Sequence, residues 1–321
     1  MSANDVPRLS ARVDDALAGQ RLDQALASLF DGFSRSRLQQ WIREGRVRVD
    51  GKVPRARDKV CGGERVELEA VLESRDEAQA EDIPLAIVYR DEALLVVDKP
   101  AALVVHPAAG NWEGTLQNAL LHADPTLAVL PRSGIVHRLD KDTSGLLVVA
   151  RTLGAHKALV AALAAREVKR EYRAIVIGVP TAGGTVEAPI GRHPTVRTRM
   201  AVVPHGRPAT THYRVLERFR AHALLQVNLE TGRTHQIRVH LAHVRHPIVG
   251  DPVYAGRLRI PPGATPLLAE ALRGFGRQAL HAHRLALAHP VTGEWLEWHA
   301  PMPTDMQALL AVLRTDAEAT G

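Results

Sequence analysis

The chain has 321 residues, of which 45% are hydrophobic and 24% are charged. These are ordinary values for globular proteins, so they exclude a mostly disordered or fibrous chain, and the length favours two domains. The single cysteine, Cys61, excludes a disulfide scaffold and a zinc site built from several cysteines, and it fits the reducing cytoplasm. No stretch approaches the roughly 20 apolar residues that a membrane span needs, and the net charge of +6 indicates a polyanionic partner.

The first part of the chain predicts a helix–helix–hairpin module over residues 18–70, preceded by a flexible lead over residues 1–17. Two apolar stripes at helical spacing, over 22–30 and 38–42, predict the helices. Alternating apolar and polar residues then predict two strands, at 46–50 and 64–69. The local signals are Ser34 as the cap of the second helix, Gly45 as its end and Asp50-Gly51 as a hairpin turn.

Basic residues crowd into the second helix and the hairpin of this module. Nine of them lie between Ser34 and Lys59, opposed by only three acidic residues. Such a density of positive charge is typical of a surface that binds phosphates, although a solvated charged face is the alternative. The residues that we expect to contact a nucleic acid, either RNA or DNA, are Arg35, Arg37, Arg43, Arg46 and Lys52.

The composition changes after the module. Residues 71–83 are polar and acidic, which predicts a linker. Residues 84–314 alternate short apolar strands with fewer helices, which predicts an α+β domain built on a mixed, mostly antiparallel sheet with flanking helices. A disordered tail is expected at 315–321. The expected strands are 93–97, 103–105, 145–150, 172–177, 211–216, 223–229 and 280–287, and the expected helices are 155–166, 234–243 and 306–314.

Three polar clusters in this second domain are candidates for chemistry. The densest runs from His137 to Ser144 in front of an apolar strand, where catalytic groups are often held in loops, although a charged surface turn has the same composition. The second is Gly-Arg-Thr-His-Gln-Ile-Arg238, in which Thr234 is the expected cap of a helix. The third is Lys-Arg-Glu-Tyr172 at a strand start, where core packing is the alternative role for the tyrosine.

The motifs of several other enzyme classes are absent from the sequence. The 16 histidines include His240, His243 and His246 at intervals of three, but no HExxH zinc motif is present. No Walker loop and no G-x-G-x-x-G follows a predicted strand, and there is no G-x-S-x-G nucleophile elbow. The sequence therefore predicts neither a metal nor a cofactor.

The stretch His137-Arg-Leu-Asp-Lys-Asp-Thr-Ser-Gly145 resembles the signature of the RluA-type pseudouridine synthases. Tyr172 and the Gly-Arg-Thr-His-Gln-Ile-Arg238 segment match the same family, as do Asp-Lys-Pro100 and His106-Pro107. Residues 18–70 resemble an S4 RNA-binding domain. Together the resemblance covers about nine-tenths of the chain.

This resemblance implies an isomerase that turns uridine into pseudouridine without cofactor or metal. Asp140 would be the catalytic carboxylate, acting either as a nucleophile on the sugar or as a base. Arg238 would be its charge partner, and Tyr172 would stack on the uracil and assist proton removal. Arg138 would insert into the RNA as the target base flips out, with Lys141 and Arg233 as phosphate contacts.

Further segments are similar to the branch of the family that modifies the helix 69 stem-loop of 23S ribosomal RNA. The expected partner is therefore this RNA, within the large ribosomal subunit or its precursor, and the expected state is a cytoplasmic monomer. A sister synthase acting at other 23S uridines, a non-catalytic RNA-binding or assembly factor and a histidine-rich metal hydrolase are the alternatives. The segments begin at Thr181, Pro189, His246, Arg277 and Glu297.

Overall fold

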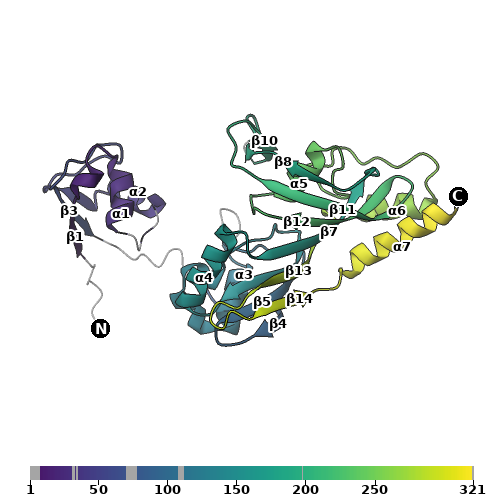
Figure 1. The fold of residues 1–321 in the computed structure, drawn as a ribbon, viewed down its shortest axis with the longest axis horizontal. Coiled ribbons are helices and arrows are strands. Elements are labelled where there is room, and N and C mark those ends of the chain that lie inside the picture. The colour runs from purple at the N-terminus through teal and green to yellow at the C-terminus, as the bar shows by residue number, and fades with distance from the viewer. Residues whose placement is uncertain are drawn as a thin grey trace. The chain divides into compact units, whose positions relative to one another are not determined.

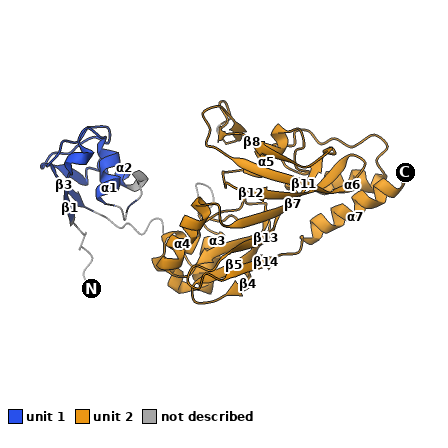
Figure 2. Ribbon diagram, viewed as in Figure 1, with its two compact units in different colours: residues 1–77 blue, residues 78–321 orange. Residues whose placement is uncertain are grey.

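The computed structural model describes residues 8–30, 33, 35–69, 78–107, 112–196 and 198–319. The chain divides into two compact units, residues 1–77 and 78–321 (Figure 2). Each unit has its own hydrophobic core, so each is described by itself. Some predicted features lie outside the described residues. They are the helix cap Ser34, the last residue of the predicted module at 70, and residues 71–77 of the predicted linker.

The first unit packs two helices, α1 (Leu22–Leu29) and α2 (Arg35–Arg43), with a three-stranded antiparallel sheet. The sheet order is β1 (Arg8–Arg12), β3 (Arg65–Glu69), β2 (Val47–Val49). The apolar stripes that predicted the helices are confirmed, because most of their members are buried in one cluster with Val47, Val66 and Leu68. The buried helix and helix-end residues are Leu22, Ala25, Leu26, Phe30, Leu38, Trp41 and Ile42.

Backbone geometry explains the turns of this unit. Asp50 and Gly51 both have positive φ, and they form a two-residue turn in which the amide and carbonyl groups of Val49 and Lys52 bond to each other. Gly45 also has positive φ, just beyond the end of α2, as predicted. The expectation of a flexible lead is wrong for residues 8–17, because β1 pairs along β3 and Asp15–Leu17 form a 3-10 turn.

The second unit is built on a nine-stranded sheet in the order β4-β5-β6-β13-β7-β12-β11-β8, with β14 paired to β13 (Figure 1). Only β6 and β13 run parallel, so the predicted α+β fold with a mixed, mostly antiparallel sheet is confirmed. The sheet strands are β4 (Ala86–Arg90), β5 (Leu94–Lys99), β6 (Ser144–Ala150), β7 (Lys169–Ile177), β8 (Gly184–Glu187), β11 (Thr210–Arg218), β12 (His222–Leu229), β13 (Leu280–Ala288) and β14 (Trp295–His299). A separate pair is formed by β9 (Ile190–Arg192) and β10 (Met200–Val202).

Both faces of the sheet are covered around β5 and β6. Leu95 and Val97 belong to the larger core cluster, whereas Leu94 and Val96 belong to a second cluster on the opposite face. This double burial explains why the strand sequence is a continuous apolar run rather than an alternation. The larger cluster takes in helices α3 (Leu116–Ala123), α5 (Gln236–His243), α6 (Pro266–Gly274) and α7 (Thr304–Ala319), and the second takes in α4 (Leu153–Ala164).

Three predictions for this unit are wrong. Residues 103–105 form only an isolated bridge, from Val104 to Thr115, instead of a strand. The predicted linker does not extend over 78–83, because Glu81 accepts hydrogen bonds from the Gly114 amide and Asn118 donates to the Gln79 carbonyl. The predicted disordered tail is helical up to residue 319, where α7 ends.

Two helices were not predicted, although the sequence holds a signal for each. α3 follows Thr115, which forms a capping box with Asn118, and α6 follows the Thr265-Pro266 start. No helix among the described residues is long and apolar enough to span a membrane.

Candidate active site

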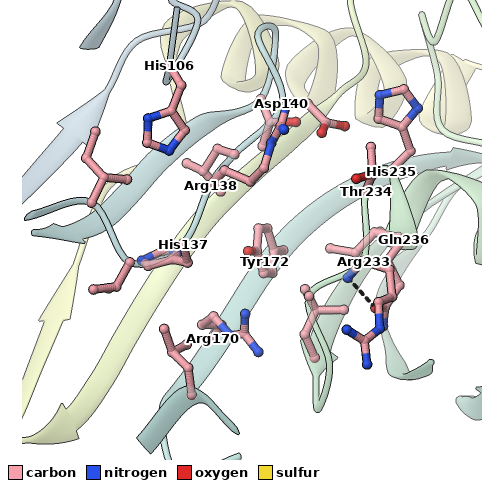
Figure 3. A pocket seen from close by; sticks show the side chains of 18 of the residues that line it. His106, His137, Arg138, Asp140, Arg170, Tyr172, Arg233, Thr234, His235 and Gln236 are labelled. Atoms are coloured by element: carbon pink, nitrogen blue, oxygen red, sulfur yellow. Dashed lines mark hydrogen bonds between the residues drawn. The ribbon is translucent and has the colours of Figure 1, made fainter. Parts of the chain in front are cut away.

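Four segments that are distant in sequence line one cavity of about 570 Å³ in the second unit. They are residues 104–107, the loop that leads from residue 135 into β6, the start of β7, and the segment 232–237 that enters α5. Figure 3 shows Asp140, Tyr172 and Arg170 around this cavity, with Arg233, Thr234 and His235 on its opposite wall. This volume is within the range of small-molecule pockets.

Asp140 is held by Arg238, as the sequence predicted for the carboxylate's charge partner. The Arg238 Nη1 donates to the Asp140 carboxylate over 3.0 Å. The same guanidinium donates through Nε and Nη2 to both oxygens of Asp251, at 2.7 and 2.8 Å. One cation therefore joins two carboxylates, of which Asp251 is fully buried and Asp140 is 16% exposed toward the cavity.

This arrangement keeps Arg238 charged in a buried place. Burial by itself lowers the pKa of the guanidinium, but the hydrogen bonds and charges of Asp251 and Asp140 outweigh burial and raise it. Asp251 is fixed in turn, because its Oδ1 accepts the amides of Val253 and Tyr254. Asp251 was not recognised from the sequence as a site residue. The physical signal for it is that a buried arginine needs carboxylates to compensate its charge.

Aromatic groups close this network from the other side. The Arg238 guanidinium lies 5.0 Å from the ring centre of Tyr254. The Tyr254 hydroxyl accepts from the Met200 amide and lies 2.7 Å from His235 Nδ1. His235 has a left-handed backbone and precedes the first residue of α5, so the prediction that Thr234 caps this helix is wrong.

Tyr172 is 5% exposed and belongs both to the main core cluster and to the cavity wall. The two roles considered for it, core packing and a site residue, are therefore compatible. Burial raises the pKa of its hydroxyl, the positive charge of Arg170 lowers it and the negative charge of Asp140 raises it again. Both charged residues thus act on this hydroxyl from nearby.

A buried lysine fixes the loop that carries Asp140. The ammonium of Lys99, at the end of β5, donates to the carbonyls of Pro100, Leu103 and Lys141 at 2.8, 2.8 and 2.9 Å. Burial lowers the pKa of Lys99 to about 7. Because Lys141 directly follows Asp140, these bonds hold the loop of Asp140 to the sheet. In the sequence Lys99 stands out only as part of Asp-Lys-Pro, so this role was not predicted.

Of the RNA contacts that were predicted in this unit, two line the cavity and one does not. Arg138 and Arg233 both line the cavity, and Arg138 is exposed. The Arg233 Nε donates to the Pro208 carbonyl over 3.2 Å. Lys141 is exposed but does not line the cavity.

In the first unit, Arg43 and Lys52 are exposed. Arg46 pairs with Glu44 over 2.9 Å, so part of its charge is already compensated. Arg35 and Arg37 lie at the start of α2, and their side chains lie outside the described residues.

His240, one of the three histidines at intervals of three, bonds to protein groups instead of a metal. His240 Nδ1 lies 2.8 Å from the Thr211 hydroxyl and its Nε2 lies 2.9 Å from the Ala188 carbonyl. His281 lies between the Ser144 hydroxyl and the Ala300 carbonyl. Among the residues that the structure describes, no three His, Cys, Asp or Glu side chains gather as metal ligands.

Comparison with known proteins agrees with this geometry. The family model of RNA pseudouridylate synthases matches residues 93–243, and that of S4 domains matches residues 20–66. The ribosomal large subunit pseudouridine synthase D of Escherichia coli O6:H1 is 57% identical over 312 residues, which cover 97% of this chain and 96% of that protein. The protein of the same name from Pseudomonas aeruginosa is 59% identical over 316 residues, covering 98% and 99%.

Solved structures show the same fold for the second unit. The human RNA pseudouridylate synthase domain-containing proteins 1 and 4 superimpose with TM-scores of 0.55 and 0.56, at 28% and 27% identity. They cover 73% and 71% of this chain, and 89% and 93% of their own. Since relatives more than half identical match nearly the full length, the chain belongs to the RluA-type family of pseudouridine synthases and is an RNA uridine isomerase that carries an S4 domain.

Proposed function

We propose that this enzyme isomerises uridines in the helix 69 stem-loop of 23S ribosomal RNA, with Asp140 as its catalytic carboxylate. The names of the relatives, ribosomal large subunit pseudouridine synthase D, support the choice of RNA. The observation that carries the chemistry is the Asp140 carboxylate, held at the cavity by the buried Arg238 and facing the same space as Tyr172. A carboxylate that is paired with a guanidinium at the wall of such a cavity suits attack on, or proton removal from, a ribose.

The reaction exchanges one bond of the base for another. The bond between N1 and C1′ breaks with its electron pair left on the uracil, and the base turns. C5 then bonds to C1′, C5 loses its proton and N1 gains one, so substrate and product are isomers. Asp140 either bonds C1′ and is displaced when C5 bonds to the same carbon, or takes a proton from the sugar and returns it after the new bond has formed. Tyr172 stacks on the uracil and assists removal of the C5 proton.

The target base has to leave its stack before it can enter the cavity. Arg138, exposed at the rim, fills the gap that the base leaves, because its flat guanidinium stacks between neighbouring bases. Lys141 and Arg233 contact phosphates near the site. The S4 domain adds affinity through Arg35, Arg37, Arg43, Arg46 and Lys52, and the enzyme acts as a monomer in the cytoplasm on the large subunit or its precursor.

Tritium release from RNA labelled at uridine C5 tests the role of Asp140. Asp140→Asn should release less than about 1% of the wild-type tritium while binding RNA within about tenfold of wild type, since phosphate contacts supply most of the affinity. Glu270→Gln is the control, because this exposed carboxylate of the same unit does not line the cavity, and it should retain activity. Activity of Asp140→Asn above that level would remove Asp140 from the mechanism.

The choice of uridines needs a separate experiment. Pseudouridine is mapped across 23S ribosomal RNA in a strain that lacks this gene and in the same strain complemented with it. Loss and recovery confined to helix 69 support the proposal, whereas recovery at other uridines identifies a sister synthase. Repeating the reaction on naked RNA and on isolated large subunits shows which of the two is the substrate.

A further inference from the structure

Arg170, at the start of β7, is a buried guanidinium without an acceptor. Its side chain is 7% exposed and lines the cavity. Its Nε is buried without a hydrogen-bond partner, and no hydrogen bond or ion pair joins the guanidinium to another residue in the described part of the chain. A buried donor left unsatisfied is costly. This group is therefore expected to meet an acceptor that enters the cavity.

The surroundings of Arg170 leave room for it and present a second donor. A Cβ added at Gly232 would lie 2.9 Å from Nη1 of Arg170, so the glycine of the Gly-Arg-Thr-His segment makes space for the guanidinium. His137 also lines the cavity, and its Nε2 accepts the Val148 amide over 3.1 Å. The proton of the neutral ring therefore sits on Nδ1, which is buried and has no acceptor either.

The position of Arg170 selects one part of the substrate. Arg170 and Tyr172 are two residues apart in β7, so their side chains lie on the same face of the strand, about 7 Å apart. In Figure 3, Tyr172 lies between Asp140 on one side and Arg170 on the other. With the sugar at Asp140 and the uracil over Tyr172, as proposed above, the edge of the base that is farthest from the sugar lies toward Arg170.

We infer that Arg170 is a further catalytic residue, which donates hydrogen bonds to the uracil carbonyl opposite the atom that bears the sugar. In uridine this carbonyl is O4, because C4 lies across the ring from N1. In pseudouridine it is O2, because C2 lies across the ring from C5. A half-turn of the base about its C6–N3 axis exchanges the two, so the guanidinium has an acceptor both before and after the turn.

This hydrogen bond has two chemical consequences. When the N1–C1′ bond breaks, the electron pair on N1 is shared with O2 and, through the C5–C6 double bond, with O4, so a guanidinium at either oxygen stabilises the detached base. A positive group placed where charge develops in a dry site accelerates such a step. Cytosine carries an amino group at C4, which is a donor, so the same guanidinium rejects cytidine.

A phosphate is the competing ligand for a guanidinium in an RNA-binding enzyme. Arg138 lines the cavity and is exposed, whereas Arg170 is nearly fully buried. A phosphodiester that reached Arg170 would have to bring its charge and both flanking sugars into the cavity. The base needs neither, and uracil carbonyls are neutral acceptors that suit buried donors.

Single-turnover kinetics with excess enzyme test the inference on an RNA that the wild-type enzyme modifies. Arg170→Met fills a similar volume without donors, and its rate constant should fall about 10²–10³-fold, as for removal of an oxyanion donor. The Kd for RNA and its salt slope should stay unchanged. If the Kd weakens, the slope falls by about 0.7–0.9 and the rate constant at saturation survives, then Arg170 binds a phosphate and the inference is wrong.

A second variant separates the hydrogen bond from stability. Gly232→Ala retains Arg170 but pushes its guanidinium aside, and the backbone at 232 accepts alanine because its φ is not positive. Its rate constant should fall at least about tenfold with an unchanged melting temperature, whereas Gly276→Ala, in open space, should behave as wild type. A wild-type rate for Gly232→Ala would contradict the inference even if Arg170→Met failed to fold.

Substrate analogues finally ask which atom Arg170 touches. Placing 4-thiouridine at the target weakens the acceptor, so the wild-type rate should fall at least about tenfold, while Arg170→Met, which has no donor to offer, should slow little further. Equal reductions in both enzymes would refute a hydrogen bond to O4. The inference rests on the proposed roles of Asp140 and Tyr172. If those roles are wrong, Asp140→Asn stays active, and the ratio of the rates on uridine and 4-thiouridine does not change. The two failures are therefore distinguishable.

Discussion

The two units of this enzyme use positive charge in opposite ways. In the S4 domain, Arg43 and Lys52 are exposed, and Arg46 pairs at the surface with its neighbour Glu44. In the catalytic unit, Arg238 is 6% exposed and joins two carboxylates, and Lys99 is fully buried among three carbonyls. The surface charges of the first unit suit long-range attraction to phosphates, whereas each of these two buried cations holds a particular group in place.

This difference indicates which unit should change the affinity for RNA when it is mutated, and which should change the rate. Exposed cations act together and are screened by salt, so the removal of one changes affinity in small steps. A buried cation has partners that stay behind without compensation when it is removed, so the effect of removing it is large and local. The comparison therefore predicts opposite profiles for substitutions in the two units.

The largest effect is expected at Arg238. Arg238→Ala leaves the buried Asp251 and the cavity residue Asp140 without a counter-charge, and should lose about 3–5 kcal/mol of stability and nearly all activity. Arg238→Lys keeps the charge but not the planar fork that serves both carboxylates, so it should retain little activity. Thermal unfolding and tritium release measure the two effects. Normal turnover of Arg238→Lys would mean that the fork does not hold Asp140, and Arg233 would be tested next.

An intermediate effect is expected at Lys99, and it depends on pH. The three carbonyls need three N–H donors, which only the ammonium has, and burial lowers the pKa of Lys99 from its usual 10.5 to about 7. The single-turnover rate constant should therefore fall as pH rises through about 7, as the loop carrying Asp140 loosens. Lys99→Met should be slower at pH 6 and insensitive over this range, whereas the exposed Lys157→Met should follow wild type.

Stability should change in the other direction over the same range. Between pH 7 and 10.5 the unfolded chain holds the Lys99 proton and the folded chain does not, so this residue makes the free energy of unfolding rise with pH. A fall in rate above pH 7 is then not a loss of fold. A rate that rises with pH through 7 in wild type, and equally in Lys99→Met, would contradict the role given to Lys99.

The smallest effect on turnover is expected in the S4 domain. The double variant Arg43→Gln/Lys52→Gln should weaken RNA binding and lower the log–log salt slope by roughly 0.7–0.9 for each phosphate that is no longer neutralised. Turnover at saturating RNA should stay within about twofold of wild type, because neither side chain belongs to the catalytic unit. An unchanged Kd and salt slope would show that these charges are only solvated surface.

Much of the fold followed from periodicity and local signals. The apolar stripe of α2 and the continuous runs of β5 and β6 were recognisable because burial on one or two faces leaves a direct pattern in the sequence. The strand β1 was not predicted because its short alternation, Arg8–Arg12, becomes a strand only by pairing with β3. Residues 78–83 have a linker's composition, and only the partners Gly114 and Asn118 attach them to the catalytic unit.

The candidate site was predictable in part for the same reason. Asp140 lies in a dense polar loop that matches a family signature, and the structure places it against Arg238 as expected. The sequence did not single out Asp251, Lys99 or Arg170. Asp251 and Lys99 bond to groups that are distant in the sequence, and Arg170 is notable because its Nε has no hydrogen-bond partner among the described residues. Spacing along the chain carries no information on such interactions, which arise only when the segments meet.

The central claim is that the catalytic unit supplies chemistry and the S4 domain supplies affinity. The most direct test measures the single-turnover rate constant and the salt slope of RNA binding for Asp140→Asn and for Arg43→Gln/Lys52→Gln, on the same RNA. We predict a rate below about 1% of wild type with an unchanged slope for the first variant, and a normal rate with a lower slope for the second. A second variant that loses rate at saturating RNA while keeping its slope, or a first variant that stays active, would contradict the claim.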